Sequence, residues 1–381
     1  MSHSKKILFI TENISWGGSE LLWSKTVLEL ITFNYNIAIC VNEKLKLPIE
    51  ILSLEKETKI KINRLSNNSL PFLKRIMNRV LPYSKRFKSP NLKHKFILDF
   101  NSDLIVINQG LNFDGVHSML FALQNNLNYV TISHAVNEGQ WPNVVLRKKM
   151  QVGFTNSVKN YFVSHNNLLV TQNQLGAILK NAEIVRNPFN VSFDINLDFP
   201  KLDNFHLAFV GRYHFYAKGQ DVILQTLSDE KWKNRNLIVN FYGEGNDIEN
   251  LKDLIEMYQL NNAIVHFHTS TEQIWQKNHG LILTSRFEGL PIVIVEAMLC
   301  KRFVIVTNVS GSHELVLDNE TGFIAAAPRP EYVDEALERA WEKRMNWEEM
   351  GIKAKQEVTT QIPENPANDF AHKLQHILSN L

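Results

Sequence analysis

The sequence predicts an α/β protein of two domains, each built on a doubly wound, Rossmann-like parallel sheet. At 381 residues the chain is longer than one typical core needs. Short apolar runs alternate with helical patterns in both halves, as the strands and helices of a parallel sheet do. Residues 1–200 contain 23 Lys or Arg and 14 Asp or Glu, whereas residues 201–381 contain 18 and 25. Opposite charge in the two halves indicates two domains with different neighbours.

The first half opens with a strand at Lys6–Thr11, a loop that contains Gly17 and Gly18, and a helix that extends to about Leu30. The glycine pair allows the backbone to approach a ligand, and Ser19 or Glu20 can cap the helix. Further strands are expected at residues 36–41, 103–108, 129–133, 159–164 and 183–186. His134 follows one of these strands directly. In open α/β sheets ligands bind beyond the carboxyl ends of strands, so His134 is a candidate site residue.

A change of pattern marks the boundary between the domains. Residues 187–204 contain two prolines and little periodicity, which is typical of a linker. We therefore expect an N-terminal domain at residues 1–187 and a C-terminal domain at residues 188–364. The second half has strands at Phe205–Val210, Leu237–Tyr242, 264–267, 280–284 and Phe303–Thr307. The closing helix, within residues 365–381, is too polar on one side to stand free and is expected to dock elsewhere.

Residues 283–297, LTSRFEGLPIVIVEA, combine a helix start with two glutamates, Glu288 and Glu296. Pro291 suits the first helical turn, where its missing N–H would have no intrahelical partner anyway. The N–H groups of Gly289 and Leu290 are then free to bind a phosphate. Glu296 lies roughly 12 Å further along the axis, at about 1.5 Å per residue. This spacing fits one ligand with a phosphate at one end and hydroxyls at the other. The alternative is an ordinary turn with two incidental glutamates.

The stretch between Glu57 and Asp99 contains no acidic residue. Within it, apolar residues at near-helical spacing over residues 70–81 alternate with basic ones. A basic amphipathic helix of this kind can lie on an anionic membrane surface. The alternative is a helix that packs on its own domain and leaves its charges in solvent. The candidate membrane residues are Lys74, Arg75, Arg79, Lys85, Arg86 and Lys88.

Several classes of protein do not fit the sequence. The dinucleotide fingerprint is incomplete, because Ile248 stands where Gly243 and Gly245 require a third glycine. No phosphate-binding Walker loop, no metal-ligand spacing of Cys and His, no Asp-x-Asp pair and no nucleic-acid module is visible. No signal peptide or membrane-spanning run is visible either. Two cysteines make no disulfide framework, so a reducing, cytoplasmic compartment is expected.

Arg212 and Lys218 lie in the loop after the strand at Phe205–Val210, where ligands of such sheets bind. In a cleft, both side chains can reach a leaving diphosphate and stabilise its developing charge without a metal. Solvated loop residues are the alternative. Together with the helix start at Gly289, the two cations form a coherent anion site.

With these motifs, the chain resembles retaining glycosyltransferases of the GT-B fold, similar to family 4 (glycosyl transferases group 1). The resemblance rests on GGSE at residues 17–20, His134, RNPF at 186–189, FVGRYHFYAKGQD at 209–221, YGEG at 242–245 and SRFEGLPIVIVEAM at 285–298. The last segment matches the Glu-x7-Glu motif of the family. The chain departs from the family at Lys301, Phe303, Ser310 and His268, in the surroundings of the nucleotide.

The resemblance implies a role for each matching residue. Arg212, Lys218, Gly289 and Leu290 would bind the donor diphosphate, with Gly17 and Gly18 closing over the phosphate or the acceptor entry. Glu296 would bind the ribose hydroxyls, Glu288 would face the reacting sugar, and His134 would contact that sugar from the opposite domain. The final helix would cross back to the N-terminal, acceptor-binding domain.

The expected function is metal-independent, retaining transfer of a sugar from a UDP- or GDP-linked donor, with no cofactor. The expected acceptor is a glycan or lipid-linked glycan of cell-surface polysaccharide or glycoconjugate synthesis. The enzyme would lie peripherally on the inner face of the cytoplasmic membrane, without nucleic acid as a partner. Two alternatives remain: a sugar-nucleotide isomerase or phosphorylase on the same fold, and a catalytically silent glycan-binding protein.

Overall fold

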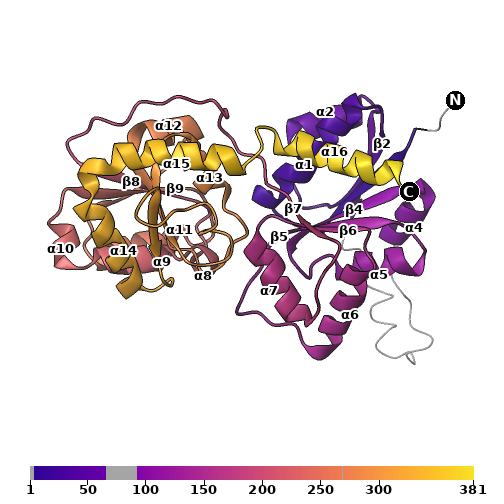
Figure 1. The fold of residues 1–381 in the computed structure, drawn as a ribbon, viewed down its shortest axis with the longest axis horizontal. Coiled ribbons are helices and arrows are strands. Elements are labelled where there is room, and N and C mark those ends of the chain that lie inside the picture. Colours follow the sequence, from indigo (N-terminus) through magenta and orange to yellow (C-terminus); the bar gives the residue numbers. More distant parts are fainter. Residues whose placement is uncertain (1–3, 66–91, 268) are drawn as a thin grey trace, which may run out of the picture.

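The structure is a computed structural model, and it describes residues 4–65, 92–267 and 269–381. Figure 1 shows two halves, each with a sheet between layers of helices. In the described part of the chain, seven parallel strands form the first sheet, in the order β3-β2-β1-β4-β5-β6-β7, and six form the second, in the order β10-β9-β8-β11-β12-β13. The prediction of two doubly wound α/β domains is confirmed. The exact boundaries at residues 187 and 364 remain a prediction.

The first half contains strands and helices in alternation. The strands are β1 (Lys6–Thr11), β2 (Asn36–Asn42), β3 (Ile60–Leu65), β4 (Leu104–Leu111), β5 (Tyr129–Ala135), β6 (Lys159–Phe162) and β7 (Ala182–Ile184). The helices are α1 (Gly18–Thr32), α2 (Ile49–Lys56), α4 (Leu92–Phe100), α5 (Val116–Gln124), α6 (Val144–Thr155) and α7 (His165–Leu175).

The second half repeats the pattern. Its strands are β8 (Phe205–Val210), β9 (Leu237–Tyr242), β10 (Ala263–His266), β11 (Gly280–Leu283), β12 (Phe303–Thr307) and β13 (Gly322–Ala325). Its helices are α8 (Phe215–Lys218), α9 (Gln220–Leu227), α10 (Glu230–Lys233), α11 (Ile248–Met257), α12 (Thr271–Lys277), α13 (Ile292–Leu299), α14 (Pro330–Glu342) and α15 (Trp347–Gln361), followed by α16 (Pro366–Ser379).

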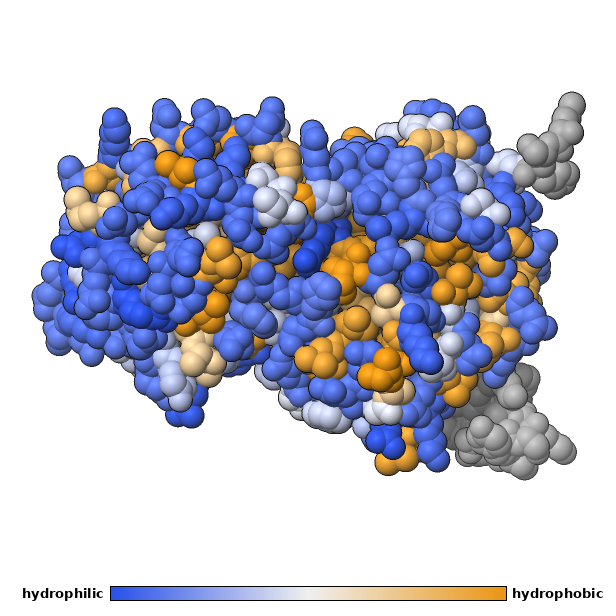
Figure 2. All heavy atoms as spheres, in the orientation of Figure 1, coloured by the Kyte–Doolittle hydropathy of each residue, from blue (hydrophilic) through white to orange (hydrophobic). Residues whose placement is uncertain are grey.

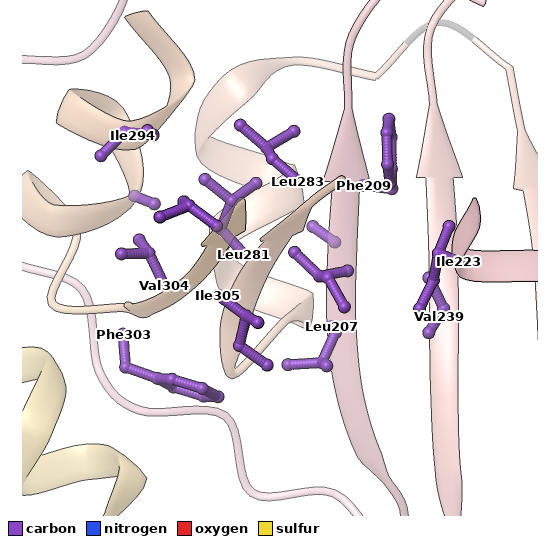
Figure 3. Packing of buried hydrophobic residues seen from close by; sticks show 14 of the residues in the cluster. Leu207, Phe209, Ile223, Val239, Leu281, Leu283, Ile294, Phe303, Val304 and Ile305 are labelled. Atoms are coloured by element: carbon purple, nitrogen blue, oxygen red, sulfur yellow. The ribbon is translucent and has the colours of Figure 1, made fainter. Parts of the chain in front are cut away.

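Successive residues of a strand point to opposite faces of its sheet, and this places two apolar layers in the first half. Ile7 and Phe9 of β1 pack with α1 and α16, whereas Leu8 and Ile10 pack with α4–α7. In the second half one large core fills both faces. Figure 3 shows part of it, which includes Leu207 and Ile305 of the sheet and Ile294 of α13. Because helices cover both faces of each sheet, the carboxyl ends of the strands are where a site can be built.

The closing helix α16 lies on the first half, beside α1, whereas α15 covers the second (Figure 1). Phe370 packs edge-on against Tyr161 of β6, with ring centroids 5.0 Å apart. The Thr26 hydroxyl of α1 donates to the Ala367 carbonyl at 3.3 Å. The predicted return of the chain to the N-terminal half is confirmed, and it gives the polar helix the partner that its sequence lacks locally.

Some local predictions are wrong. His134 is part of β5 and does not follow it, and Pro291 is the N-cap of α13 rather than its first helical residue. Gly17, and not Ser19, is the N-cap of α1, whereas Glu20 caps the helix as expected, because its side chain accepts from the Gly17 N–H. The sequence pattern also does not predict the strands β3 and β13. Both lie at the edge of a sheet: β3 mixes apolar and polar residues and is mostly half-buried or exposed, and β13 is only four residues long.

The acid-free segment is only partly described. Its ends form β3 and α4, and there Arg64 pairs with Glu55 at 2.6 Å and Lys93 with Glu12 at 2.5 Å. The candidate membrane residues, Lys74, Arg75, Arg79, Lys85, Arg86 and Lys88, lie outside the described residues.

Candidate functional site

The turn between β11 and α13 is held by the loop that follows β12. The N–H of Glu288 donates to the Ser310 hydroxyl at 3.1 Å, and the N–H of Gly311 donates to the Gly289 carbonyl at 2.8 Å. Neither Gly289 nor Leu290 donates its N–H to any acceptor among the residues that the structure describes. Pro291 caps the helix without a side-chain hydrogen bond. The positive end of α13 therefore keeps donors free for an anion.

Lys218 and Glu288 form the central ion pair of this site. The Nζ of Lys218 lies 2.5 Å from Oε1 of Glu288, which also accepts from the Ser285 hydroxyl at 2.8 Å. The two side chains are 21% and 11% exposed, so the pair is largely withdrawn from water but open on one side. The pair joins Lys218, which is expected to bind the donor diphosphate, to Glu288, which is expected to face the reacting sugar.

A tight turn brings Lys218 to this position. Gly219 has φ +66°, and a Cβ there would lie only 2.1 Å from the Thr284 carbonyl oxygen. Residue 219 therefore has to be glycine for α8 and α9 to approach the end of β11. Arg286 reinforces the approach, because its N–H donates to the Ala217 carbonyl and its guanidinium binds Asp221 through two bonds of 2.8 and 2.7 Å.

The glycine loop of the first half faces the start of α13. A Cβ on Gly18 would lie 2.9 Å from Cδ1 of Ile292, the first residue of that helix. Glu20 holds the loop, accepting from the N–H of Gly17 at 3.0 Å and from the Ser19 hydroxyl at 2.7 Å. Gly18 therefore lies across the boundary between the halves from the first turn of α13.

Arg212 is exposed and lies near this loop. Burial raises the pKa of Glu20, and the charge of Arg212 opposes that shift. The electrostatic contact runs from the second half to the first.

His134 is buried in β5, with Nε2 2.7 Å from Oδ1 of Asn108. Burial lowers the pKa of His134 to about 3, and the Asn187 side chain opposes part of this shift. The imidazole is therefore neutral near pH 7. Its backbone lies tightly against the second half, because a Cβ on Gly289 would lie 1.7 Å from the His134 carbonyl oxygen.

Glu296 is buried at the second turn of α13. Burial raises the pKa of its carboxyl, and two hydrogen bonds from Asn190 oppose the shift. Both bonds, from the Asn190 backbone at 2.9 Å and its amide at 2.8 Å, go to Oε1. No described residue donates to Oε2, which is left for a ligand.

The sequence reasoning missed Asn190, which directly follows the RNPF segment in the linker. It also missed Glu138, which accepts from the Ser310 N–H at 3.2 Å and from the Asn166 amide at 3.0 Å. Glu138 thus ties the first half to the loop that holds Glu288. No periodicity or motif marks these positions, since their partners are distant in sequence.

Known glycosyltransferases are similar in sequence to the part of the chain that carries these residues. Residues 197–357 match the family model described as Glycosyl transferases group 1. The matched segment includes Arg212, Lys218, Glu288 and Glu296. The chain is also 28% identical over 170 residues to an uncharacterized glycosyltransferase of Methanocaldococcus jannaschii, covering 44% of this chain and 46% of that protein.

A second relative is the alpha-1,3/1,6-mannosyltransferase ALG2 of Dictyostelium discoideum. It is 29% identical over 140 residues, which is 35% of this chain and 32% of ALG2. The chain thus matches less than half the length of each of these two curated relatives.

Solved structures match the whole chain. Anabaena HepE in complex with UDP superposes with a TM-score of 0.75 at 16% identity, covering 99% of this chain and 100% of HepE. Sucrose-phosphate synthase from Thermosynechococcus elongatus gives a TM-score of 0.76 at 13% identity, with coverage of 99% and 100%. The architecture is the GT-B fold, as the sequence predicts.

Two further properties concern only the described residues. In that part of the chain, no group of three or more His, Cys, Asp or Glu side chains is arranged to hold a metal ion. Nor does any described helix have the length and apolar character needed to cross a bilayer.

Proposed function

We propose that this protein is a retaining, metal-independent glycosyltransferase that uses a nucleotide-activated sugar. The observation that carries the proposal is the Lys218–Glu288 pair at the uncapped start of α13. A cation, a carboxylate and free backbone donors meet there, at the boundary between two Rossmann-like halves. The match of residues 197–357 to a glycosyltransferase family supports the same conclusion.

In this proposal the donor diphosphate lies between the two halves. Arg212 and Lys218 bind its oxygens, and the N–H groups of Gly289 and Leu290 donate to it from the positive end of α13. Gly17 and Gly18 approach from the other side without side chains in the way. These groups supply the charge stabilisation that other transferases obtain from a divalent metal, so no metal or other cofactor is required.

The two glutamates bind different parts of the donor. Glu296 accepts ribose hydroxyls on Oε2, while Asn190 holds Oε1 in place. Glu288 faces the reacting sugar, where its carboxylate orients hydroxyls and stabilises positive charge at the anomeric carbon. His134, neutral and fixed by Asn108, contacts the same sugar from the first half.

The transfer step breaks the bond between the anomeric carbon and the diphosphate oxygen. The acceptor hydroxyl oxygen bonds to that carbon on the same face, and its proton goes to the departing diphosphate. Arg212 and Lys218 act mainly here, because negative charge grows on the leaving group as the bond breaks.

The donor is UDP- or GDP-linked, and the solved complex of HepE with UDP favours UDP. The proposed acceptor is a glycan or lipid-linked glycan at the inner face of the cytoplasmic membrane, in cell-surface polysaccharide or glycoconjugate synthesis.

A panel of UDP- and GDP-sugars tests the proposal, since a tightly bound donor raises the melting temperature by mass action. With the best donor, slow release of free nucleotide diphosphate identifies a transferase. An isomerase or phosphorylase would not release it, and a silent glycan-binding protein would not turn over at all.

Lys218→Ala and Glu288→Ala should each lower that release by about 100-fold or more, because each removes transition-state stabilisation. Lys201→Ala, at an exposed lysine of the linker, is the matched control. Near-parental rates in both site variants would refute the assignment.

A further inference from the structure

A cluster of large apolar side chains is exposed on the first half, outside the candidate site. We call it the α6–α7 face; its apolar members are Trp141, Val144, Val145, Leu169 and Ile178. Trp141 is 62% exposed and Ile178 is 75% exposed, so these side chains are not covered by the domain that carries them. Figure 2 shows apolar and strongly hydrophilic side chains gathered together over this part of the molecule.

The charge of this face has one sign. No Asp or Glu occurs between Glu138 and Glu183, whereas that stretch contains Arg147, Lys148 and Lys149 in a row on α6. All three are exposed, and none lies within ion-pair distance of a carboxylate in the described part of the chain. Lys149 lines a groove of about 530 Å³ together with Val144 and Val145. Cationic and apolar groups therefore share one surface.

The loop that carries Trp141 is fixed and leads directly from the boundary between the domains. The Gln174 amide of α7 donates to the carbonyls of Asn137 and Gln140 at 3.0 and 3.1 Å. The Asn137 amide donates to the Tyr216 hydroxyl of the second half at 3.1 Å. Trp141 then meets Leu169 and Ile178 of the α7 region around a second groove, of about 640 Å³. The α6–α7 face thus begins beside a contact between the two halves.

We propose that the α6–α7 face binds the surface of an anionic lipid bilayer. Trp141, Val144 and Val145 enter the headgroup region, where an aromatic ring with apolar neighbours is most stable. Arg147, Lys148 and Lys149 contact lipid phosphates. Charge complementarity decides for this partner: an apolar protein partner would not require three unpaired cations, and an acidic one would not require exposed valines and a tryptophan.

This inference rests on the proposed function, in which the acceptor lies at the membrane, and it names the surface through which the enzyme would bind that membrane. The residues of this surface lie outside the acid-free segment near residues 57–99. Binding to vesicles is measured without donor or turnover. Its failure would therefore leave the transfer reaction intact, and a failure of transfer would leave this binding unaffected.

The test is co-sedimentation of the full chain with lipid vesicles at low and at high salt. The vesicles contain phosphatidylcholine alone or phosphatidylcholine with roughly 30% of the anionic lipid phosphatidylglycerol. We expect binding only to the anionic vesicles, weakened by salt. Lys148→Gln with Lys149→Gln should weaken it by about 25-fold, since each cation near such a surface strengthens binding about fivefold. Trp141→Ala should weaken it by about tenfold through lost apolar burial.

Lys201→Gln with Lys277→Gln is the matched control, because it removes two exposed lysines from outside this face. It should bind like the parent, and all variants should keep the parental melting temperature. Parental binding by the Lys148/Lys149 variant, equal binding to both vesicle types, or no binding at low salt would each overturn the proposal. So would a dimer that Trp141→Ala converts to a monomer, because the face would then be a contact between copies of this chain.

Discussion

Replacement of Gly289 by alanine tests whether contact between the two halves builds the site. Gly289 does not have a positive φ, so alanine suits its backbone and only the neighbours forbid a side chain. A Cβ would lie 1.7 Å from the His134 carbonyl oxygen, whereas real Cβ contacts are essentially never below 3.0 Å. The difference, 1.3 Å, is the least displacement that Gly289→Ala imposes between the two halves.

A displacement of about 1 Å at a catalytic site can cost about 100-fold in rate, which corresponds to about 2.7 kcal/mol. We therefore expect Gly289→Ala to lower kcat/KM for nucleotide diphosphate release by about that factor. The fold of each half should persist, because none of the three apolar cores includes Gly289.

The assay pairs donor turnover with thermal unfolding. Gly176→Ala is the control. Gly176 has φ +66° at the end of α7, and nothing lies within 4 Å of the point that a Cβ would occupy. Alanine there lowers stability through backbone strain but does not disturb the boundary between the two halves. It should unfold at lower temperature with near-parental turnover. Parental kcat/KM in Gly289→Ala at parental melting temperature would refute the view that this contact sets the site geometry.

Two further predictions concern buried titratable groups. Asn190→Ala removes one of two hydrogen bonds to the buried Glu296 carboxyl. It should lower the free energy of unfolding, measured by chemical denaturation, by about 1–3 kcal/mol, and it should weaken the binding of UDP in calorimetry. Unchanged stability would show that the bond is dispensable. His279 is buried, and burial lowers its pKa from 6.5 to about 4. Between those pH values the unfolded chain therefore binds more protons than the folded protein. The stability due to a neutral His279 is thus lost as pH falls through that window. The free energy of unfolding should fall by up to about 1.4 kcal/mol per pH unit more in the parent than in His279→Gln, and identical pH slopes would contradict this.

Most of the fold could be predicted because the information is local. A buried parallel strand such as Phe303–Thr307 is an unbroken apolar run, and a helix such as Ile292–Leu299 follows a glycine-proline turn. The two strands that were missed form no long apolar run, because β3 mixes apolar and polar residues and β13 is only four residues long. The capping errors at Gly17 and Pro291 are shifts of one or two residues, since several neighbours could satisfy the same end groups.

The candidate site could be predicted only in part. The residue types needed to bind a diphosphate are visible in the sequence at Arg212, Lys218 and Gly289. Their mutual placement is not, because the Lys218–Glu288 contact depends on the tight approach of Gly219 to Thr284. Asn190 carries no motif of its own, and only its bonds to Glu296 reveal its part.

By itself the sequence determined two α/β domains, and it predicted a phosphate-binding helix start and the set of candidate residues, because hydrophobic periodicity and turn chemistry act over a few neighbouring residues. Tertiary structure alone decided that His134 is buried and neutral, that Gly18 and Gly289 are contact points between the halves, and that the exposed Trp141 lines a groove with Leu169 and Ile178. These properties depend on burial and on distances between residues far apart in the chain, and no local pattern specifies them.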